Sequence, residues 1–84
     1  MAWVYIVRCA DGTLYTGATR REPAHRVRVH NLGQGAKYCR ARLPVRLVWC
    51  ESHETWRAAL KREYAIKQMG RAGKLALIEG CHDG

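Results

Sequence analysis

The stretch WVYIVRCADGTLYTGAT, residues 3–19, decides the fold of this chain. Residues 3–9 and 13–19 are rich in Val, Ile, Tyr, Trp and Thr, the residue types that favour β-strands. Asp11-Gly12 between them is typical of a tight turn. We therefore predict a β-hairpin at the start of the chain.

The length of the hairpin loop determines which face each tyrosine occupies. A two-residue loop at Asp11-Gly12 would put Tyr5 and Tyr15 on opposite faces, and a three-residue loop, Ala10-Asp11-Gly12, would put them on one face. Three-residue loops commonly end with a glycine in the left-handed region. Because Gly12 suits that position and a shared site requires both tyrosines on one face, we predict the three-residue loop, with Gly12 at positive φ.

Downstream of the hairpin, the sequence predicts three helices and one more strand. Pro23 suits the first turn of a helix that ends near His30, before Gly33, and a glycine-rich, basic loop follows at 33–43. A strand is expected at 45–50, after Pro44. A helix is expected at 53–68, with Ser52 as its N-cap, and it should break at Gly70. A short helix at 71–78 should then turn three apolar side chains toward the core: Leu75, Leu77 and Ile78.

The expected fold is α/β of the α+β type. A small three-stranded, mainly antiparallel sheet is flanked by helices in the order β-β-α-β-α-α. The length of 84 residues allows one domain, 1–84, with a core at about 3–78 and a tail at 79–84.

The charge of the chain is strongly positive. Fifteen Lys and Arg residues against seven Asp and Glu give a formal net charge of +8, so nucleic acid is the expected partner. No membrane is expected, because the opening apolar run stops at Arg8, far too short to span a bilayer. No targeting signal is visible, which favours the cytoplasm.

The four cysteines do not form a metal-binding pattern. None is spaced as C-x-x-C or placed at finger-like spacing from a His, so a structural zinc site is not expected. Cys9 and Cys50 fall in apolar runs, where a cysteine usually packs as a small hydrophobe. Cys81-His82 is interpreted as part of the tail. All four are expected to be reduced, which suits the cytosol.

Two groups of helical side chains could carry chemistry. Arg26 and His30 are four residues apart and share a helix face, where an Arg can grip a phosphate and a His can donate a hydrogen bond or a proton. Glu63 falls in an apolar stripe, a costly place for a carboxylate unless it is paired or bound to a metal. The stripe consists of Trp56, Ala59, Leu60, Glu63 and Ile66. Solvated bases and a Glu63–Lys67 ion pair are the ordinary alternatives.

The basic loop could bind nucleic acid. Lys37, Tyr38, Arg40 and Arg42 place positive charges around an aromatic ring, which suits backbone phosphates plus a stacked base. Basic loops are common, so this pattern is weak by itself.

In combination, these segments resemble the GIY-YIG nuclease superfamily, in its small stand-alone bacterial single-domain branch. Trp3-Val4-Tyr5 and Tyr15-Thr16-Gly17 stand where the two name-giving tripeptides lie on paired strands; the first keeps its Tyr, and the second its Tyr and Gly. Arg26 and His30 match an Arg followed four residues later by His or Tyr, and Glu63 matches the metal-binding Glu of a later helix. The resemblance covers about residues 3–78. No Asn follows Glu63, where the family often has one.

The resemblance implies an endonuclease that hydrolyses phosphodiester bonds in DNA, structured or single-stranded, with Mg²⁺ or Mn²⁺, in repair or processing. Glu63 would hold the ion, and Arg26 would stabilise charge on the phosphate. Tyr5 or Tyr15 would help activate the attacking water, and His30 could relay the proton. The residues expected to contact nucleic acid, DNA rather than RNA, are Gly17, Lys37, Tyr38, Arg40 and Arg42.

Two other functions fit the same sequence. One is a nucleic-acid-binding module that has lost turnover, which the positive charge would serve equally well. The other is an accessory subunit that binds a protein partner in a larger repair complex. Metal-dependent cutting would separate the first from an enzyme, and co-purification would reveal the second.

Overall fold

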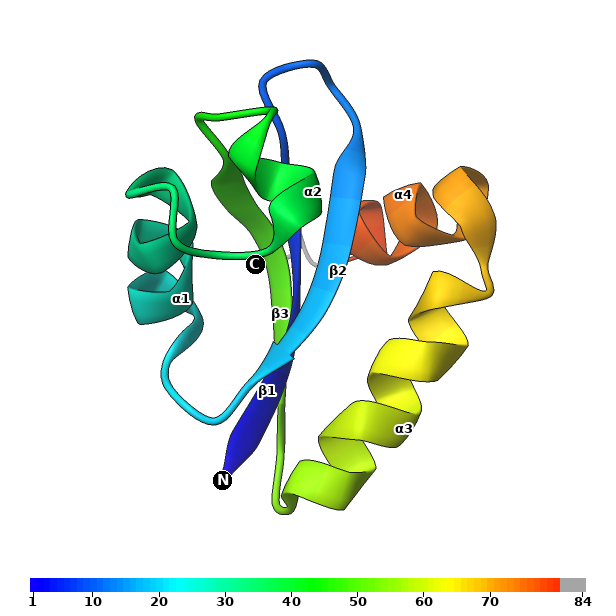
Figure 1. The fold of residues 1–84 in the computed structure, drawn as a ribbon. Coiled ribbons are helices and arrows are strands. Elements are labelled where there is room, and N and C mark those ends of the chain that lie inside the picture. The colour runs from blue at the N-terminus through cyan, green and yellow to red at the C-terminus, as the bar shows by residue number, and fades with distance from the viewer. Residues whose placement is uncertain (81–84) are drawn as a thin grey trace.

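The structure, a computed structural model, describes residues 1–80. Its elements, in chain order, are β1 (Ala2–Arg8), β2 (Leu14–Thr19), α1 (Pro23–Asn31), α2 (Lys37–Arg40), β3 (Arg46–His53), α3 (Trp56–Lys67) and α4 (Gly70–Gly80). The strands form one antiparallel sheet in the order β2-β1-β3 (Figure 1). The predicted fold class and element order are confirmed, and α2 adds a short helix inside the predicted loop at 33–43.

The β1–β2 hairpin has the predicted three-residue loop. Tyr5 pairs with Gly17, and Tyr15 stands two places earlier on β2, so the side chains of both tyrosines lie on one face of the sheet. Gly12 has a φ of 86°, which is easy for glycine and costly for other residues. The condition for a shared tyrosine site is therefore met.

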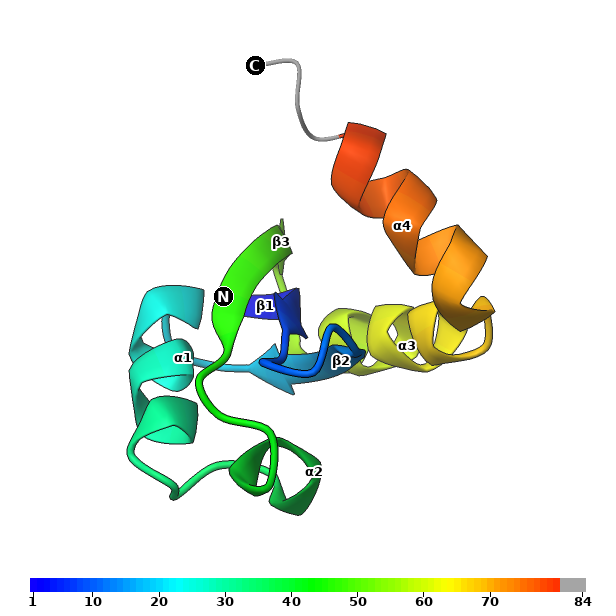
Figure 2. The same ribbon diagram turned by 90° about the horizontal axis from the view of Figure 1, so that it is seen from above.

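Helices cover both faces of the sheet (Figure 2). The face under α1 and α2 carries a core cluster of Tyr5, Val7, Cys9, Cys39 and Val45. The face under α3 and α4 carries a second cluster of Ala2, Val4, Ile6, Trp49, Ala59 and Ile66. Alternate residues of the central strand β1 thus enter two separate cores, as the pleat of a strand requires.

The start of the third helix differs from the prediction. β3 continues to His53, so Ser52 lies in the strand and is not a cap. The strand is extended because β1 pairs with it to the end, where Ala2 lies opposite His53. α3 begins at Trp56. Its N-cap is Thr55, whose Oγ1 accepts a hydrogen bond from the backbone N–H of Ala58 at 3.0 Å.

Three side chains are less buried than the sequence indicates. Leu60 is 41% exposed, because it lies beyond the buried side of α3 that Ala59 occupies. Leu75 is only half-buried. Cys50 is exposed, because it follows the buried Trp49 in β3 and alternation directs it away from that core.

The final helix is longer than predicted. α4 extends to Gly80, so residues 79 and 80 are helical and do not belong to a tail. The remainder of the predicted tail, with Cys81-His82, lies outside the described residues. Within residues 1–80, no helix has the length and apolar character needed to cross a membrane.

Candidate active site

A buried hydrogen bond joins the hairpin to α1. The Nε2 of His30 lies 2.9 Å from the Oη of Tyr5, and both residues are almost fully buried. On the other side of the imidazole, the Ala36 N–H donates to Nδ1 at 3.3 Å. A neutral imidazole has one N–H and one lone pair, so the ring carries its hydrogen on Nε2 and donates it to Tyr5. The Tyr5 oxygen is therefore an acceptor in this pair.

Two glycines make room for these rings. A Cβ on Gly17 would lie 2.5 Å from the Oη of Tyr5, and a Cβ on Gly35 would overlap the imidazole of His30. Neither glycine has a positive φ. Space, rather than backbone conformation, therefore favours glycine at both positions. Gly17, which the sequence places among the nucleic-acid contacts, here accommodates the phenol of Tyr5.

Arg26 lies one helical turn before His30 on α1 and acts on both buried rings. Burial raises the pKa of Tyr5 to about 12, and the guanidinium of Arg26 is the largest influence that opposes this rise. Burial, and then the charge of Arg26, lowers the pKa of His30. The cation therefore favours the phenolate form of Tyr5 and the neutral form of His30.

Tyr15 is the point at which elements from both faces of the sheet meet. Its ring lies edge-on to His30 at 5.8 Å and is stacked on Tyr38 of α2 at 5.9 Å. The Nζ of Lys67, on α3, lies 5.8 Å from the centroid of the Tyr15 ring. Because β2 is an edge strand, side chains from α3 can reach the site past it. Burial raises the pKa of Tyr15, and the charge of Lys67 is the main influence that lowers it.

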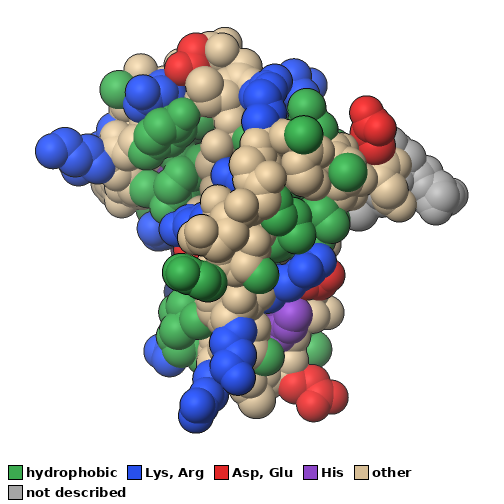
Figure 3. Space-filling view, turned by 90° about the vertical axis from the view of Figure 1, so that its right-hand side faces the viewer, with side chains coloured by type: hydrophobic (Ala, Val, Ile, Leu, Met, Phe, Trp, Pro, Cys, Tyr) green, Lys and Arg blue, Asp and Glu red, His purple; other side chains and the backbone are tan. Residues whose placement is uncertain are grey.

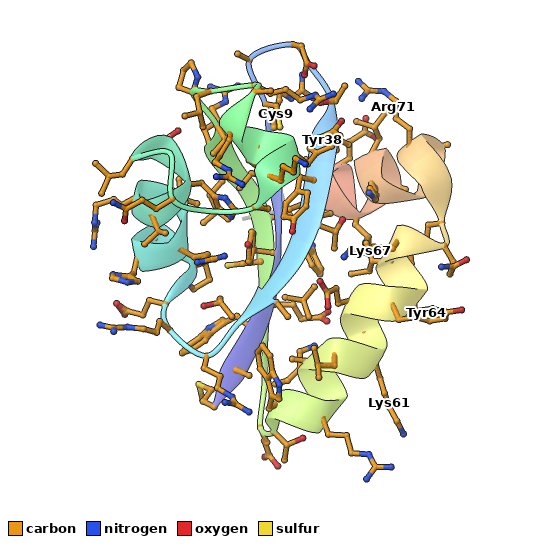
Figure 4. The ribbon with its side chains drawn as sticks, viewed as in Figure 1. Cys9, Tyr38, Lys61, Tyr64, Lys67 and Arg71 are labelled. Atoms are coloured by element: carbon orange, nitrogen blue, oxygen red, sulfur yellow. The ribbon has the colours of Figure 1, made fainter. Side chains whose placement is uncertain are left out.

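Glu63 reaches the same place from α3. Its Oε2 lies 3.1 Å from the Nζ of Lys67, and its side chain is 18% exposed. The negative charge of Glu63 raises the pKa of Tyr15, so the carboxylate is near that phenol. Figure 4 shows Lys67 directed from α3 toward β2, whereas Lys61 and Tyr64 project away from the sheet. Glu63 and Lys67 thus occupy the side of α3 that borders β2.

The basic residues of the loop fall into two kinds. Lys37 and Arg40, on α2, are exposed. Tyr38 is stacked on the tyrosine of β2, and the guanidinium of Arg42 lies 3.9 Å from the centroid of the Tyr38 ring. Arg42 also forms an ion pair with Asp11 at 3.1 Å, which connects the end of this loop to the hairpin. Tyr38 and Arg42 are therefore engaged within the protein.

The structure brings the five candidate catalytic residues together at the β2 edge of the sheet. Tyr5, His30, Arg26 and Tyr15 form one connected group under α1 and α2. Glu63 joins that group from α3, through its charge on Tyr15 and its ion pair with Lys67. The helical spacing predicted that Arg26 and His30 are neighbours, and the hairpin register predicted that Tyr5 and Tyr15 share a face.

Other contacts had no clear sequence signal. The side-chain amide of Asn31 donates to the carbonyl oxygen of Val45 at 3.0 Å and accepts from its N–H at 2.8 Å. This pair of bonds holds the end of α1 against the segment that leads into β3. The contact of Ala36 with His30 is similarly hidden, because it uses a backbone N–H. Lys67 is visible in the sequence only as an ion-pair partner of Glu63.

A divalent cation at this place would depend mainly on Glu63. Among residues 1–80, no three His, Cys, Asp or Glu side chains gather as a metal site. Mg²⁺ typically binds to one or two carboxylates and completes its shell with water and substrate phosphate. Thr16, on the α3 side of β2, has a buried hydroxyl without a hydrogen-bond partner in the described structure. A single carboxylate fits an ion that binds together with water and substrate phosphate, and not a closed structural site.

Comparison with known proteins covers nearly the whole chain. The family model of the GIY-YIG catalytic domain matches residues 1–76. A UPF0213 protein of Staphylococcus aureus strain Mu3 is 56% identical over 77 residues, which span 92% of this chain and 93% of that protein. The solution NMR structure of a UPF0213 protein from Bacillus halodurans is 37% identical and superposes with a TM-score of 0.62, covering 99% of this chain and 88% of that one.

Proposed function

This chain belongs to the GIY-YIG family of endonuclease domains, and from this premise we propose that it is a divalent-metal-dependent endonuclease that hydrolyses phosphodiester bonds in DNA. The observation that carries the proposal is the group at the β2 edge. There a buried phenol receives a hydrogen bond from a neutral His and lies beside an Arg, with a carboxylate close to the second phenol. These are the groups that a phosphodiester hydrolase needs.

Tyr5 is the proposed general base. Burial raises the pKa of Tyr5 to about 12, so the free protein holds it as the neutral phenol. The Nε2–H of His30 and the charge of Arg26 act toward the phenolate, and the charge of a bound metal ion would act in the same direction. Because Tyr5 is only 1% exposed, the attacking water must reach it past the partly exposed Tyr15 and Arg26. Tyr15 then orients the water or the phosphate. Comparing Tyr5→Phe with Tyr15→Phe separates these roles.

Arg26 and His30 support the reacting groups in different ways. Arg26 can donate to phosphate oxygens and stabilise the charge that develops on them. His30 uses both ring nitrogens in hydrogen bonds, with Ala36 and Tyr5, and its lowered pKa keeps it neutral. No lone pair of the ring is left for a proton relay. We therefore assign His30 as a neutral hydrogen-bond donor to Tyr5.

Glu63 is the proposed holder of the metal. A bound Mg²⁺ or Mn²⁺ ion would supply positive charge to the phosphate and to the leaving oxygen. Lys67 neutralises Glu63 in this structure, at 3.1 Å. A cation bound to Glu63 would repel the ammonium of Lys67, whose Nζ could then turn to a phosphate of the substrate. Lys67 thereby keeps the carboxylate paired when no metal is bound.

The best-supported of the proposed nucleic-acid contacts are the exposed basic side chains of α2. Lys37 and Arg40 are free to approach backbone phosphates. Tyr38 and Arg42 instead support Tyr15 and the hairpin. We place the activity in DNA repair or processing in the cytoplasm. The buried thiols of Cys9 and Cys39 suit a reducing compartment.

A cleavage screen tests the proposal. Branched, flapped, single-stranded and double-stranded DNA, with RNA counterparts, are incubated with the pure protein in Mg²⁺ or Mn²⁺. We expect nicking of at least one DNA substrate, and loss of nicking in a chelator. Tyr5→Phe and Arg26→Ala should each lower the rate on the order of 100-fold or more, since each removes a group that acts in the transition state. Binding without cutting on every substrate would instead support the binding module.

A further inference from the structure

A second feature lies between the hairpin and α4, on the side of the sheet that α3 and α4 cover. A cavity of about 230 Å³ is lined by Thr13, Leu14, Gly70, Arg71 and Lys74. Arg71 spans its rim, because its Nη1 donates to the carbonyl oxygen of Gly12 at 3.0 Å. Figure 4 shows Arg71 extending from the start of α4 toward the hairpin. Leu14, which lines the cavity, directly precedes Tyr15 in the edge strand β2, and their side chains lie on opposite faces of the sheet.

The cavity has an excess of positive charge. Its lining contains two cations and no carboxylate. Lys74 forms no ion pair with any residue in the described part of the chain. Burial, and then the charge of Lys67, lowers the pKa of Lys74, so the two ammonium groups repel each other. An anion between them would relieve this repulsion and replace the water that burial removes from Lys74.

Lys67 connects the cavity to the proposed active site. It pairs with Glu63, lies over the ring of Tyr15, and is near enough to Lys74 to lower that residue's pKa. Basic groups thus run from the proposed catalytic group to the cavity. Figure 3, which faces α3 and α4, shows basic side chains at several places on this side of the molecule.

We propose that this cavity binds a backbone phosphate of the nucleic acid. The next phosphodiester along the same nucleic-acid strand would then lie at Tyr15. This inference rests on the proposed function and adds a second contact point for the substrate. The volume is below the roughly 300 Å³ at which pockets for drug-sized ligands begin, so it suits a phosphate group better than a whole nucleotide. Arg71 has N–H groups left to donate after its bond to Gly12, because a guanidinium carries five.

The consequence concerns the length and position of the substrate. A nucleic-acid strand that is bound both at Tyr15 and in the cavity must extend beyond the cleaved bond on the α4 side. The cavity would position that strand and take no part in the chemistry, because phosphate contacts fix register. Short substrates that end at the cleaved bond should therefore bind more weakly than longer ones.

Lys74→Gln tests the proposal without disturbing a bond of the fold, since Lys74 has no ion-pair partner among residues 1–80. Lys61→Gln is the matched control, because it removes the same charge from a side chain that projects away from the sheet. Affinity for a DNA oligonucleotide is measured in a chelator across a range of salt concentrations. For Lys74→Gln we expect several-fold weaker binding at low salt and a salt slope reduced by about 1, the effect of one lost phosphate contact. Lys61→Gln should leave the slope unchanged.

Binding in a chelator separates this inference from the nuclease proposal, because it does not require cutting. Equal effects of Lys74→Gln and Lys61→Gln would overturn the inference, since they would show only a general loss of charge. A second arm titrates inorganic phosphate into the parent protein and follows the backbone NMR signals. Shifts at Leu14 and Gly70 that vanish in Lys74→Gln support the site. If those shifts occur but the oligonucleotide affinity of Lys74→Gln is unchanged, the cavity binds free phosphate and the inference fails.

Discussion

At the scale of single residues, the ion pair of Glu63 and Lys67 shows how a carboxylate is stabilised on the partly apolar side of α3. A buried carboxylate needs a partner, and Lys67 supplies one at 3.1 Å. The Lys is more exposed than the Glu, 45% against 18%, so the pair can open toward solvent. Such a pair contributes little to stability, about 0.3–0.5 kcal/mol for this helical spacing. The position of this pair is therefore better explained by function than by stability.

Glu63→Gln tests this interpretation. Cutting should fall by a factor of about 100 or more, because the proposed metal loses its carboxylate. Binding of DNA in a chelator should be equal or stronger, since a negative charge near the phosphate is gone. Cleavage rate and anisotropy measure the two effects. Glu54→Gln, at an exposed position, is the charge-matched control. If Glu63→Gln cuts as fast as the parent, the metal assignment is wrong.

Tyr5 provides a second test at this scale, through the pH dependence of stability. Its pKa is about 12 in the folded protein and 10.0 in the unfolded chain. A raised pKa means that the folded state holds the proton more tightly, so this contribution to stability is intact below pH 10 and is lost as pH rises toward 12. The loss is at most about 3 kcal/mol, since one pKa unit corresponds to about 1.4 kcal/mol.

Urea unfolding of the parent and of Tyr5→Phe, below and above pH 10, measures this difference. The variant should lose less stability than the parent as pH rises. Burial also raises the pKa of Cys39, to about 11, so ionisation of this thiol lowers the stability of the parent and of the variant alike at high pH. The difference between the two proteins therefore does not contain the effect of Cys39. Parallel loss of stability in parent and variant would show that Tyr5 ionises as it does in the unfolded chain.

At the scale of elements, α1 and the turn after it work as one unit. α1 presents Arg26 and His30 on one face, and the backbone of Ala36 returns to bond the far side of the imidazole. Gly35 allows that return, because any side chain there would occupy the place of the ring. The position of His30 therefore depends on a turn that follows its own helix.

Gly35→Ala should displace His30 and weaken its bond to Tyr5. We expect a loss of about 1–3 kcal/mol in the free energy of unfolding, as for other overpacked sites, and a lower cleavage rate. Gly80→Ala is the control, because a Cβ there meets no atom of the described residues, 1–80, within 4 Å. Thermal unfolding gives the stability, and the ¹⁵N NMR signals of the imidazole report which nitrogen carries the hydrogen. An unchanged Nε2–H signal with unchanged activity would contradict the role assigned to the turn.

At the scale of the whole molecule, the net charge of +8 governs how the protein meets its substrate. Exposed Lys and Arg side chains occur on α2 and on α3, which lie on opposite sides of the sheet. The positive field is therefore not confined to one helix. Figure 3 shows that acidic side chains are scattered on the α3 side. Attraction at long range therefore comes from the whole surface, and the choice of the cleaved bond comes from the β2 edge.

Affinity for DNA should decrease steeply with salt. Each neutralised phosphate contributes a slope of about −0.9 for duplex DNA, or about −0.7 for single strands, in a plot of log affinity against log salt. Fluorescence anisotropy of a labelled oligonucleotide in a chelator gives the slope. A slope near zero would mean that the charge of this protein does not serve nucleic-acid binding.

Features that depend on short spacings could be predicted from the sequence alone. The pattern of residues 3–19 gave the hairpin, and a glycine at position 12 allowed the three-residue loop that places Tyr5 and Tyr15 on one face. A spacing of four in a helix placed Arg26 beside His30. These features follow from the periods of strand and helix, which a local stretch contains in full.

Other features could not be predicted, because they depend on contacts between residues far apart in the chain. Pairing with β1 extended β3 through Ser52, so the cap of α3 moved to Thr55. The Ala36 N–H determined which nitrogen of His30 carries the hydrogen. The edge position of β2 allowed α3 to bring Glu63 and its partner to a site built on the other face. No local period encodes such contacts, since packing of separate elements creates them.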